Sequence, residues 1–157
     1  MESIKQLRLS IVASFIAVLL GSGLANGLEL FDTHQRYSQN DTYNTQRHQL
    51  HQQLVREAVE HAPKVNGPAL IVILGGPGAG KSTTLQLMNE LGILQKEKFV
   101  VANSDLIKEK LPEYEAFKKI SPTQAAALVH RESVEVRTKV LYQAGASSHN
   151  IILEMAA

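Results

Sequence analysis

Residues 69–82 read ALIVILGGPGAGKS, and this stretch decides the fold class. Its first six residues form an unbroken apolar run, which is typical of a parallel β-strand buried on both faces. Residues 75–82 then match the phosphate-binding loop G-x-x-x-x-G-K-[ST] at every fixed position. The apolar spacing of residues 81–91 predicts a helix directly after the loop. A strand, a glycine-rich loop and a helix in this order predict an α/β fold that binds a nucleotide through its phosphates.

The loop residues are predicted to bind phosphate and metal in different ways. Glycine lets backbone N–H groups turn toward the phosphates, where a side chain would obstruct them. Lys81 supplies a point charge to the terminal phosphates, and the hydroxyl of Ser82 is placed to bind Mg²⁺. The predicted cofactors are therefore ATP and Mg²⁺. The predicted binding residues are Gly75, Gly76, Pro77, Gly78, Ala79, Gly80, Lys81, Ser82 and Thr83.

A second chemical group follows the next predicted strand, residues 99–102. Ser104 is predicted to cap a short helix that Pro112 ends. Asp105 then lies just beyond the carboxyl end of a strand neighbouring the phosphate loop, at the edge where α/β sheets bind ligands. We interpret Asp105 as the base that takes a proton from an acceptor hydroxyl, or as a partner of Mg²⁺-bound water. The alternative is a carboxylate that only stabilises a helix N-terminus.

The last part of the chain predicts a long helix and a third strand. Residues 121–124 combine a capping serine, a proline and a glutamine, which predicts the start of a helix that runs to about residue 144. Residues 150–154 are the third predicted strand. We expect the charged and imidazole side chains of the helix to face solvent; they are His130, Arg131, Glu132 and Arg137.

These elements predict an α/β domain over residues 67–157, with a parallel sheet of the type found in P-loop kinases and helices on its faces. Such a domain ordinarily has about five strands, and three can be found here. We therefore expect the domain to lack its C-terminal part. One edge of the sheet and its apolar faces should then lie uncovered.

Residues 26–66 are polar and rich in glutamine, asparagine and histidine. A weak helical pattern over residues 46–61 predicts one helix, so we interpret the segment as a spacer whose last part packs on the domain behind it. His48 and His51 share a helix face, and His34 lies farther away. No acidic residue stands next to the pair to complete a metal site, so we interpret this face as solvated and predict no metal ion there.

Residues 1–25 have the order of a secretory signal. Lys5 and Arg8 precede an apolar run over residues 9–20, and small residues follow before a cleavage site after Ala25. An uncleaved membrane anchor is the alternative, because no charge occurs between Arg8 and Glu29. Both interpretations place residues 9–25 in contact with a membrane and the rest of the chain beyond it. We therefore predict an exported or membrane-anchored chain.

The composition of the 157-residue chain excludes several functional classes. Sixteen Lys and Arg against fifteen Asp and Glu give a net charge of +1. A nucleic-acid binder ordinarily has a basic excess, so we predict no nucleic-acid partner. The chain has no cysteine, which excludes a disulfide framework, a thiol nucleophile and a zinc site with cysteine ligands.

The segments GGPGAGKSTT, VVANSDLIKEKLPEY, VHRES and NIILE follow one another in an order that resembles the zeta toxin family of P-loop kinases. The resemblance extends over residues 68–154 and implies ATP-dependent phosphorylation of a hydroxyl on a sugar nucleotide, typically UDP-N-acetylglucosamine. It implies that Asp105 is the general base, that Lys81 and Ser82 bind phosphate and magnesium, and that Glu154 contributes to the substrate pocket. It also implies an antitoxin protein that blocks the nucleotide site.

The chain departs from the family pattern at two places that bear on activity. Met155 and Ala156 stand where the family has Gly-Thr, and the arginines that clamp the transferred phosphate in the family have no counterpart in the readable segments. We therefore expect impaired activity. The predicted leader also separates the domain from cytoplasmic ATP, unless the protein acts in the cytoplasm of a target cell.

Two alternatives to a sugar-nucleotide kinase stay open. One is a P-loop kinase for another small hydroxyl compound, and the other is a non-catalytic exported module that binds a nucleotide. A mechanical ATPase is disfavoured, because it would need an apolar strand ending in aspartate to hold Mg²⁺. Residues 151–154 come nearest to that pattern.

Overall fold

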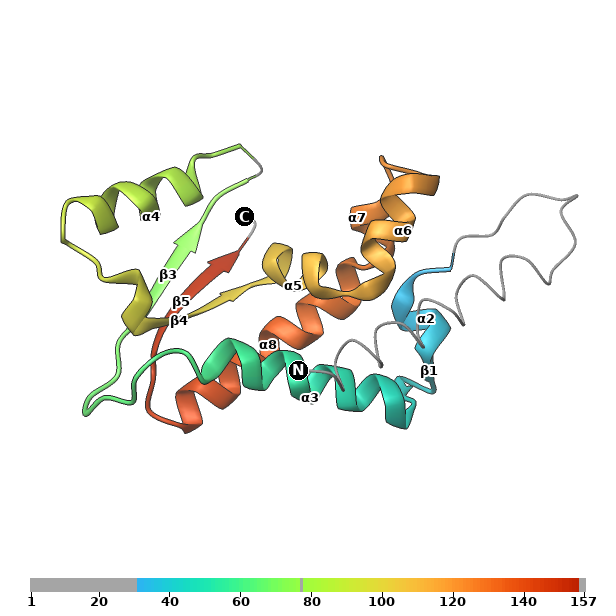
Figure 1. Ribbon diagram of the computed structural model, residues 1–157, viewed down its shortest axis with the longest axis horizontal. Coiled ribbons are helices and arrows are strands. Elements are labelled where there is room, and N and C mark those ends of the chain that lie inside the picture. The colour runs from blue at the N-terminus through green and yellow to red at the C-terminus, as the bar shows by residue number, and fades with distance from the viewer. Residues whose placement is uncertain (1–30, 77, 156–157) are drawn as a thin grey trace, which may run out of the picture.

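The structure, a computed structural model, describes residues 31–76 and 78–155 (Figure 1). The predicted leader, residues 1–25, and Pro77 lie outside this range. The N-terminal elements are α2 (Thr33–Tyr37), β1 (Ser38–Gln39), β2 (Thr42–Tyr43) and α3 (Thr45–Val59). They are followed by β3 (Leu70–Leu74), α4 (Lys81–Glu90), the short 3₁₀ helix η1 (Lys96–Lys98), β4 (Phe99–Asn103), α5 (Ser104–Lys110), α6 (Pro112–Ile120), α7 (Ala125–Leu128), α8 (His130–Ala146) and β5 (Asn150–Met155).

The main sheet consists of three parallel strands in the order β3-β5-β4. The α/β fold class and the three predicted strands are therefore confirmed. The expectation that the strand before Asp105 neighbours the phosphate loop is wrong, because β5 lies between β3 and β4. Strand β5 is the central strand, which is consistent with its apolar residues: Ile151–Leu153 are all buried.

Helices cover both faces of this sheet. Helix α8 packs on β4 and β5, and α3 packs on α8 and β4. Helix α4 covers the opposite face, where Leu85 packs with Ile152. The core on the α3/α8 side is formed by Val59, Ala62, Val100, Ala102, Val140, Ala144, Ile151 and Leu153. Because α3 contributes to this core, the segment before residue 67 and the sheet are held together by shared apolar burial.

One face of β3 is uncovered. Leu70, Val72 and Leu74 are 55%, 48% and 61% exposed. The prediction that this strand is buried on both faces is therefore wrong, because α3 and α8 lie over β4 and β5 instead. The expectation of an uncovered sheet edge with apolar side chains on it is confirmed.

The helix boundaries correct several sequence predictions. The helix predicted over residues 46–61 is present as α3, but Ser104 is not the cap of α5: the side chain of Asn103 accepts the hydrogen bond from the Asp105 backbone N–H. Pro112 ends α5 as expected, and it also begins α6, where a proline needs no N–H partner. Ser121 belongs to the end of α6 rather than to a helix start.

The predicted long helix after residue 121 is divided into α7 and α8. The division falls at Val129, a completely buried residue whose backbone is not helical. Burial of Val129 in the core between α3, α5 and α8 outweighs the local preference for one continuous helix.

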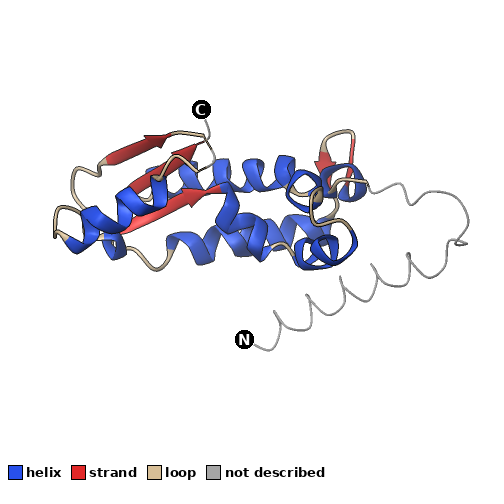
Figure 2. Ribbon diagram, turned by 90° about the horizontal axis from the view of Figure 1, so that it is seen from above, coloured by secondary structure: helices blue, strands red, loops and turns tan. Residues whose placement is uncertain are grey.

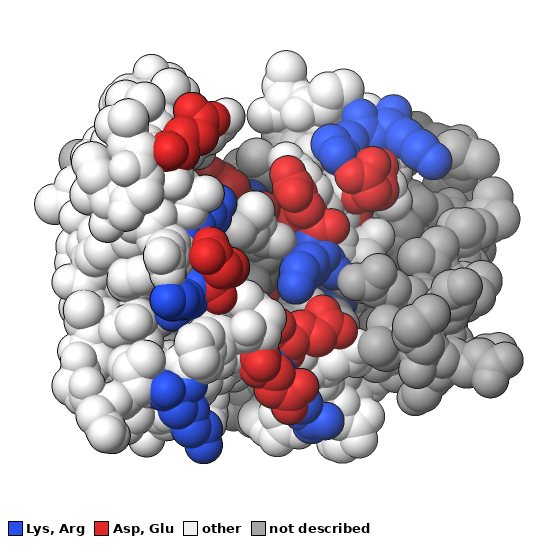
Figure 3. Space-filling model, turned by 60° about the vertical axis from the view of Figure 1, so that its left-hand side comes forward, with Lys and Arg blue, Asp and Glu red and all other residues white. Residues whose placement is uncertain are grey.

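The molecule is elongated, with the main sheet at one end and the β1–β2 hairpin and α7 toward the other (Figures 1 and 2). Helix α8 runs from the sheet end toward α7. On the face that Figure 3 shows, acidic and basic side chains alternate, and no extended patch of one sign occurs there. Within residues 31–76 and 78–155, no helix has the length and apolar character needed to cross a membrane.

Candidate functional site

The phosphate loop has the tight backbone that its glycines predict. Gly78 and Gly80 have φ angles of 76° and 77°, in the left-handed region that L side chains rarely adopt. A Cβ atom at Gly75 would lie 3.1 Å from the Cβ of Ala79. Side chains at these positions would strain the turn or crowd it, so the loop conformation accounts for the three glycines.

The loop delivers a helix N-terminus and a cation to the same place. Helix α4 begins at Lys81, and Gly80 caps it without any side-chain hydrogen bond. The first N–H groups of α4 are therefore available to an anion. The Lys81 Nζ donates to the carbonyl oxygens of Gly75 and Gly76, the latter at 3.0 Å, so the ammonium group lies over the loop.

A cavity of about 640 Å³ lies beside this loop and gathers the site residues that the sequence predicts. Lys81 and Ser82 reach it from the loop and α4, Asp105 from α5, and Glu154 from β5. The predicted residues that line it are Gly78, Ala79, Gly80, Lys81, Ser82, Thr83, Asp105 and Glu154. Gly75 and Gly76 contribute through their contacts with Lys81, and Pro77 lies outside the described residues.

Asp105 lies at the mouth of the cavity. Its side chain is 78% exposed, and Oδ1 accepts a hydrogen bond of 2.8 Å from the Nζ of Lys108, one turn along α5. The backbone N–H of Asp105 is held by the side chain of Asn103 at 2.7 Å. The carboxylate is thus fixed at one oxygen, while Oδ2 has no hydrogen-bond partner among the described residues and is free to accept a proton.

Glu154 lies deeper than Asp105, at the carboxyl end of the central strand. It is 6% exposed and pairs in register with Asn103 of β4 and Ile73 of β3. Its carboxylate makes no ion pair with any residue in the described part of the chain. Such a group can accept hydrogen bonds from the hydroxyl groups of a bound ligand.

Two further side chains line the cavity, although no sequence motif predicts a role for them. Lys108 is 12% exposed at its side chain and contributes a second cation besides Lys81. His130 is exposed at the start of α8, as predicted, but it also borders the cavity. Neither residue could be assigned to the cavity from the sequence. The packing of α5 on α8 brings together two segments that are far apart in the sequence, and both then line the same opening.

The donor set of the cavity fits Mg²⁺ that arrives with a nucleotide. Among the described residues, no group of three or more metal-ligating side chains occurs. The oxygens of Ser82, Asp105 and Glu154 are hard ligands, and Mg²⁺ is commonly bound by one or two such groups together with phosphate oxygens and water.

A buried ion-pair cluster between α3, α6 and α8 is absent from the sequence predictions. Arg47 on α3 is 1% exposed and makes two hydrogen bonds of 2.8 Å to Glu113 on α6. It makes two more, of 2.5 and 2.8 Å, to Glu132 on α8. His51 also bonds to Glu132, at 2.6 Å. The expectations that Glu132 and His51 face solvent are therefore wrong: both are completely buried, and their charges and polar atoms are satisfied inside the protein.

The cluster shifts the titration of Glu132. Burial alone would raise the pKa of this carboxyl, but hydrogen bonds from His51 and Arg47 and the charge of Arg47 outweigh it and lower the pKa to about 2. A carboxyl whose pKa is depressed in the folded state stabilises that state above its ordinary pKa, 4.5 here, and loses this contribution as the pH falls toward 2.

Replacing Glu132 by glutamine should therefore have a pH-dependent cost. At pH 7 we expect the variant to be less stable than the wild type by about 3 kcal/mol. The difference should shrink steadily between pH 4.5 and pH 2, which urea unfolding at a series of pH values measures. A difference that stays constant over this range would contradict the role of the ionised carboxylate.

Comparisons with known proteins agree with this geometry. The model of the zeta toxin family matches residues 39–157. A solved structure from the PezAT chromosomal toxin–antitoxin system of Streptococcus pneumoniae superposes with a TM-score of 0.59 at 15% sequence identity, which shows a shared fold. The match covers 73% of this chain and 47% of that protein, so this chain spans about half of its length. No curated protein matches the chain.

The family match includes the elements that build the cavity, and it also includes α3, whose sequence pattern predicts a spacer. It extends over well more than half of the chain. The phosphate loop, Asp105 and Glu154 all lie within it, so the chain belongs to the zeta toxin family.

Proposed function

We propose that this chain binds ATP at the phosphate loop and transfers the terminal phosphoryl group to a hydroxyl of a small molecule. A sugar nucleotide such as UDP-N-acetylglucosamine is the proposed acceptor. One observation carries the proposal: a single cavity joins Lys81 and the α4 N-terminus to the carboxylates of Asp105 and Glu154. This arrangement places a phosphate site beside a group that can take a proton and a group that can hold a sugar.

The residues of the cavity divide the reaction between them. The N–H groups at the start of α4 and the ammonium of Lys81 bind the phosphates and stabilise the charge on the transferred group. Glu154 accepts hydrogen bonds from the acceptor. Asp105 takes the proton of the attacking hydroxyl as that oxygen bonds to the terminal phosphorus and the bond from this phosphorus to the ADP oxygen breaks.

Magnesium would enter with the nucleotide, and the hydroxyl of Ser82 is the proposed protein ligand. When bound, the ion neutralises charge on the phosphate oxygens. Lys108 holds Asp105 through Oδ1, so the free Oδ2 is the oxygen proposed to face the acceptor.

Replacing Asp105 by asparagine tests the proposed base. We expect phosphoryl transfer to a UDP-sugar to fall by about 10²–10⁴-fold, because the amide cannot take the proton. Affinity for Mg²⁺-ATP should stay within a factor of about two, because Asp105 is outside the phosphate loop and Ser82, not Asp105, is the proposed protein ligand of the metal. The measurement combines a transfer assay with radiolabelled ATP and calorimetry of ATP binding.

Glu109→Gln is the matched control for this substitution. Glu109 is exposed on the same helix α5 and does not line the cavity. The Glu109→Gln substitution should leave both phosphoryl transfer and Mg²⁺-ATP binding unchanged. Equal activity of the wild type and Asp105→Asn would contradict the proposed base and leave Asp105 as a residue of the helix start.

A non-catalytic nucleotide-binding module is the second candidate, and one observation favours it. The cations that line the cavity in the described part of the chain are Lys81 and Lys108, with no arginine beside them. Arginine fingers contribute about 10³–10⁵-fold to the rate of phosphoryl transfer where they occur. Tight binding of Mg²⁺-ATP without transfer to any hydroxyl acceptor would support this candidate.

We also propose an antitoxin protein as a partner, since the solved structure to which the fold is similar comes from a toxin–antitoxin system. A partner that covers the cavity would compete with ATP. The proposed cellular location depends on residues 1–25, and it stays a prediction because they lie outside the described residues.

A further inference from the structure

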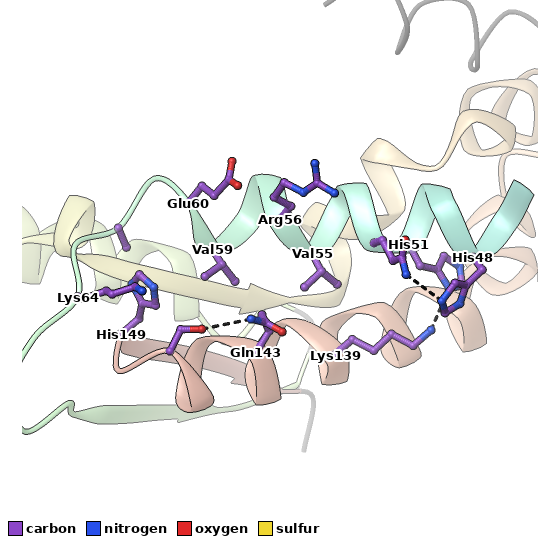
Figure 4. A pocket seen from close by; sticks show the side chains of 13 residues that line it. His48, His51, Val55, Arg56, Val59, Glu60, Lys64, Lys139, Gln143 and His149 are labelled. Carbon is purple, nitrogen blue, oxygen red and sulfur yellow. Dashed lines mark hydrogen bonds between the residues drawn. The ribbon is translucent and has the colours of Figure 1, made fainter. Parts of the chain in front are cut away.

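A second cavity, of about 800 Å³, lies in the groove between α3 and α8 (Figure 4). It shares no lining residue with the cavity at the phosphate loop. Its volume lies within the range of about 300–1,000 Å³ that is usual for small-molecule sites. The proposed kinase reaction does not use any of its residues.

The middle of this groove is apolar. Val55 and Val59 lie on successive turns of α3 and point into the space between the two helices (Figure 4). Ala62 continues the apolar lining just after the helix. These side chains favour contact with hydrocarbon rather than with a charged or hydrated group.

At one end of the groove, the cation of Lys139 is positioned by a hydrogen bond to a buried histidine. The Nζ of Lys139 lies 3.1 Å from Nδ1 of His51, and Nε2 of His51 bonds to the buried Glu132 at 2.6 Å. Burial lowers the pKa of His51, so its neutral ring donates to Glu132 and accepts from Lys139. Lys139 keeps two further N–H donors without hydrogen bonds to the described residues.

The other end of the groove also has a cation, on a loop fixed by backbone bonds. Lys64 forms a β-bridge with His149, and the backbone N–H of Val65 donates to the carbonyl of Ser148 at 2.8 Å. His149 is 5% exposed, and its Nδ1 lies 3.1 Å from the carbonyl oxygen of Pro63. The ammonium of Lys64 makes no ion pair in residues 31–76 or 78–155.

The two cationic ends are separated by the apolar middle. From His51 to Val59, α3 rises by eight residue steps, or about 12 Å, and Lys64 lies beyond the end of the helix. Arg56 adds a third cation at the rim, and Glu60 is the single carboxylate among the described lining residues. The lining therefore carries a positive excess, with Lys139 at one end, Lys64 at the other and Arg56 on α3 between them.

We propose that the groove between α3 and α8 binds a small elongated dianion, with one anionic group near Lys139, the other near Lys64, and a hydrocarbon middle on Val55 and Val59. The inference is independent of the phosphate-loop reaction. A cation at each end of the groove, with apolar surface between them, matches such a ligand in its distribution of charge.

Isothermal titration calorimetry of the full chain with decanedioate tests this proposal. Decanedioate carries a carboxylate at each end of an unbranched hydrocarbon chain, so it has the charge distribution that the proposal requires. We expect it to bind at least about tenfold more tightly than decanoate, which has one carboxylate, because the second charge-assisted hydrogen bond is then lost. We expect the same advantage over butanedioate, because its shorter hydrocarbon chain covers less of the apolar lining at Val55 and Val59.

Two variants locate the binding. Lys139→Gln and Lys64→Gln should each lower the affinity for decanedioate by about tenfold, and each should leave decanoate affinity less affected. Lys118→Gln, at an exposed lysine on α6 outside the groove, should change neither. Both groove lysines are at least partly exposed, so the variants are expected to fold, and circular dichroism checks this.

Several outcomes would overturn the proposal. They are no binding of decanedioate, equal affinity for decanoate and decanedioate, or equal loss in the Lys118→Gln control. Loss of decanedioate binding in Lys81→Ala would assign the anion to the phosphate loop instead. A concentration-dependent dimer that Lys64→Gln dissociates would assign the groove to a second copy of the chain.

Discussion

Replacing Lys81 by alanine is expected to lower the affinity for Mg²⁺-ATP by between about 30-fold and several thousand-fold, which corresponds to about 2–5 kcal/mol. The ammonium of Lys81 lies over the loop carbonyls of Gly75 and Gly76, beside the start of α4, where the terminal phosphates are proposed to bind. Without it, the loop keeps only its backbone N–H groups to balance the phosphate charge, and Lys108 on α5 is the remaining lysine of the cavity in the described part of the chain. Isothermal calorimetry with Mg²⁺-ATP measures the change.

Lys118→Ala is the matched control for Lys81→Ala. It removes a lysine from α6 whose ammonium pairs with Glu115 on the surface, so ATP affinity should not change. Thermal unfolding of both variants without ligand should resemble that of the wild type. Unchanged ATP affinity in a folded Lys81→Ala protein would contradict the assignment of this loop as the nucleotide site.

The phosphate loop could be predicted from the sequence because all of its determinants are contiguous. Gly78, Gly80 and Lys81 lie within four residues, and the strand and helix on either side depend on local apolar patterns. The left-handed φ angles of the two glycines follow from the same local requirement. Sequence patterns are most informative where a structure is determined by near neighbours.

The order of the strands could not be predicted in the same way. The position of β5 between β3 and β4 depends on contacts between residues about 50 or more positions apart, such as Val100 with Ile151. A local apolar run shows that a strand is buried, but not which strand lies beside it. The exposure of Leu70 and Val72 has the same origin, because it depends on where α3 and α8 pack.

The buried charges were beyond sequence prediction for a different reason. Charged residues are almost never completely buried unless they are paired, so Glu132 is expected at the surface when its partner is unknown. That partner, Arg47, lies 85 positions away, and the second carboxylate, Glu113, lies 66 positions from Arg47. No spacing along one helix connects them.

Replacing Arg47 by alanine is expected to lower the free energy of unfolding by about 3–5 kcal/mol, the largest effect on stability predicted for this chain. The substitution removes the cation that Glu113 and Glu132 share and leaves both carboxylates buried. It also removes the guanidinium that stacks 4.2 Å from the centre of the Tyr37 ring. Urea unfolding at pH 7 measures the loss.

Two further variants test whether the loss of stability comes from the buried cluster or from the loss of any arginine. Arg131→Ala, at a 55% exposed arginine that pairs with Asp41 and Glu135, should change stability by no more than about 0.5 kcal/mol. Arg47→Lys keeps the charge but cannot make the paired hydrogen bonds to Glu113, so its stability should lie between wild type and Arg47→Ala. Equal stability of Arg47→Ala and Arg131→Ala would show that the two carboxylates find other partners.

The buried cluster is also connected to the phosphate cavity. Arg47 joins α3 to α6 and α8. Helix α6 packs on α5, and both α5 and His130 at the start of α8 border the cavity. A stable Arg47→Lys protein with weaker ATP binding would therefore show that the cluster also positions that cavity.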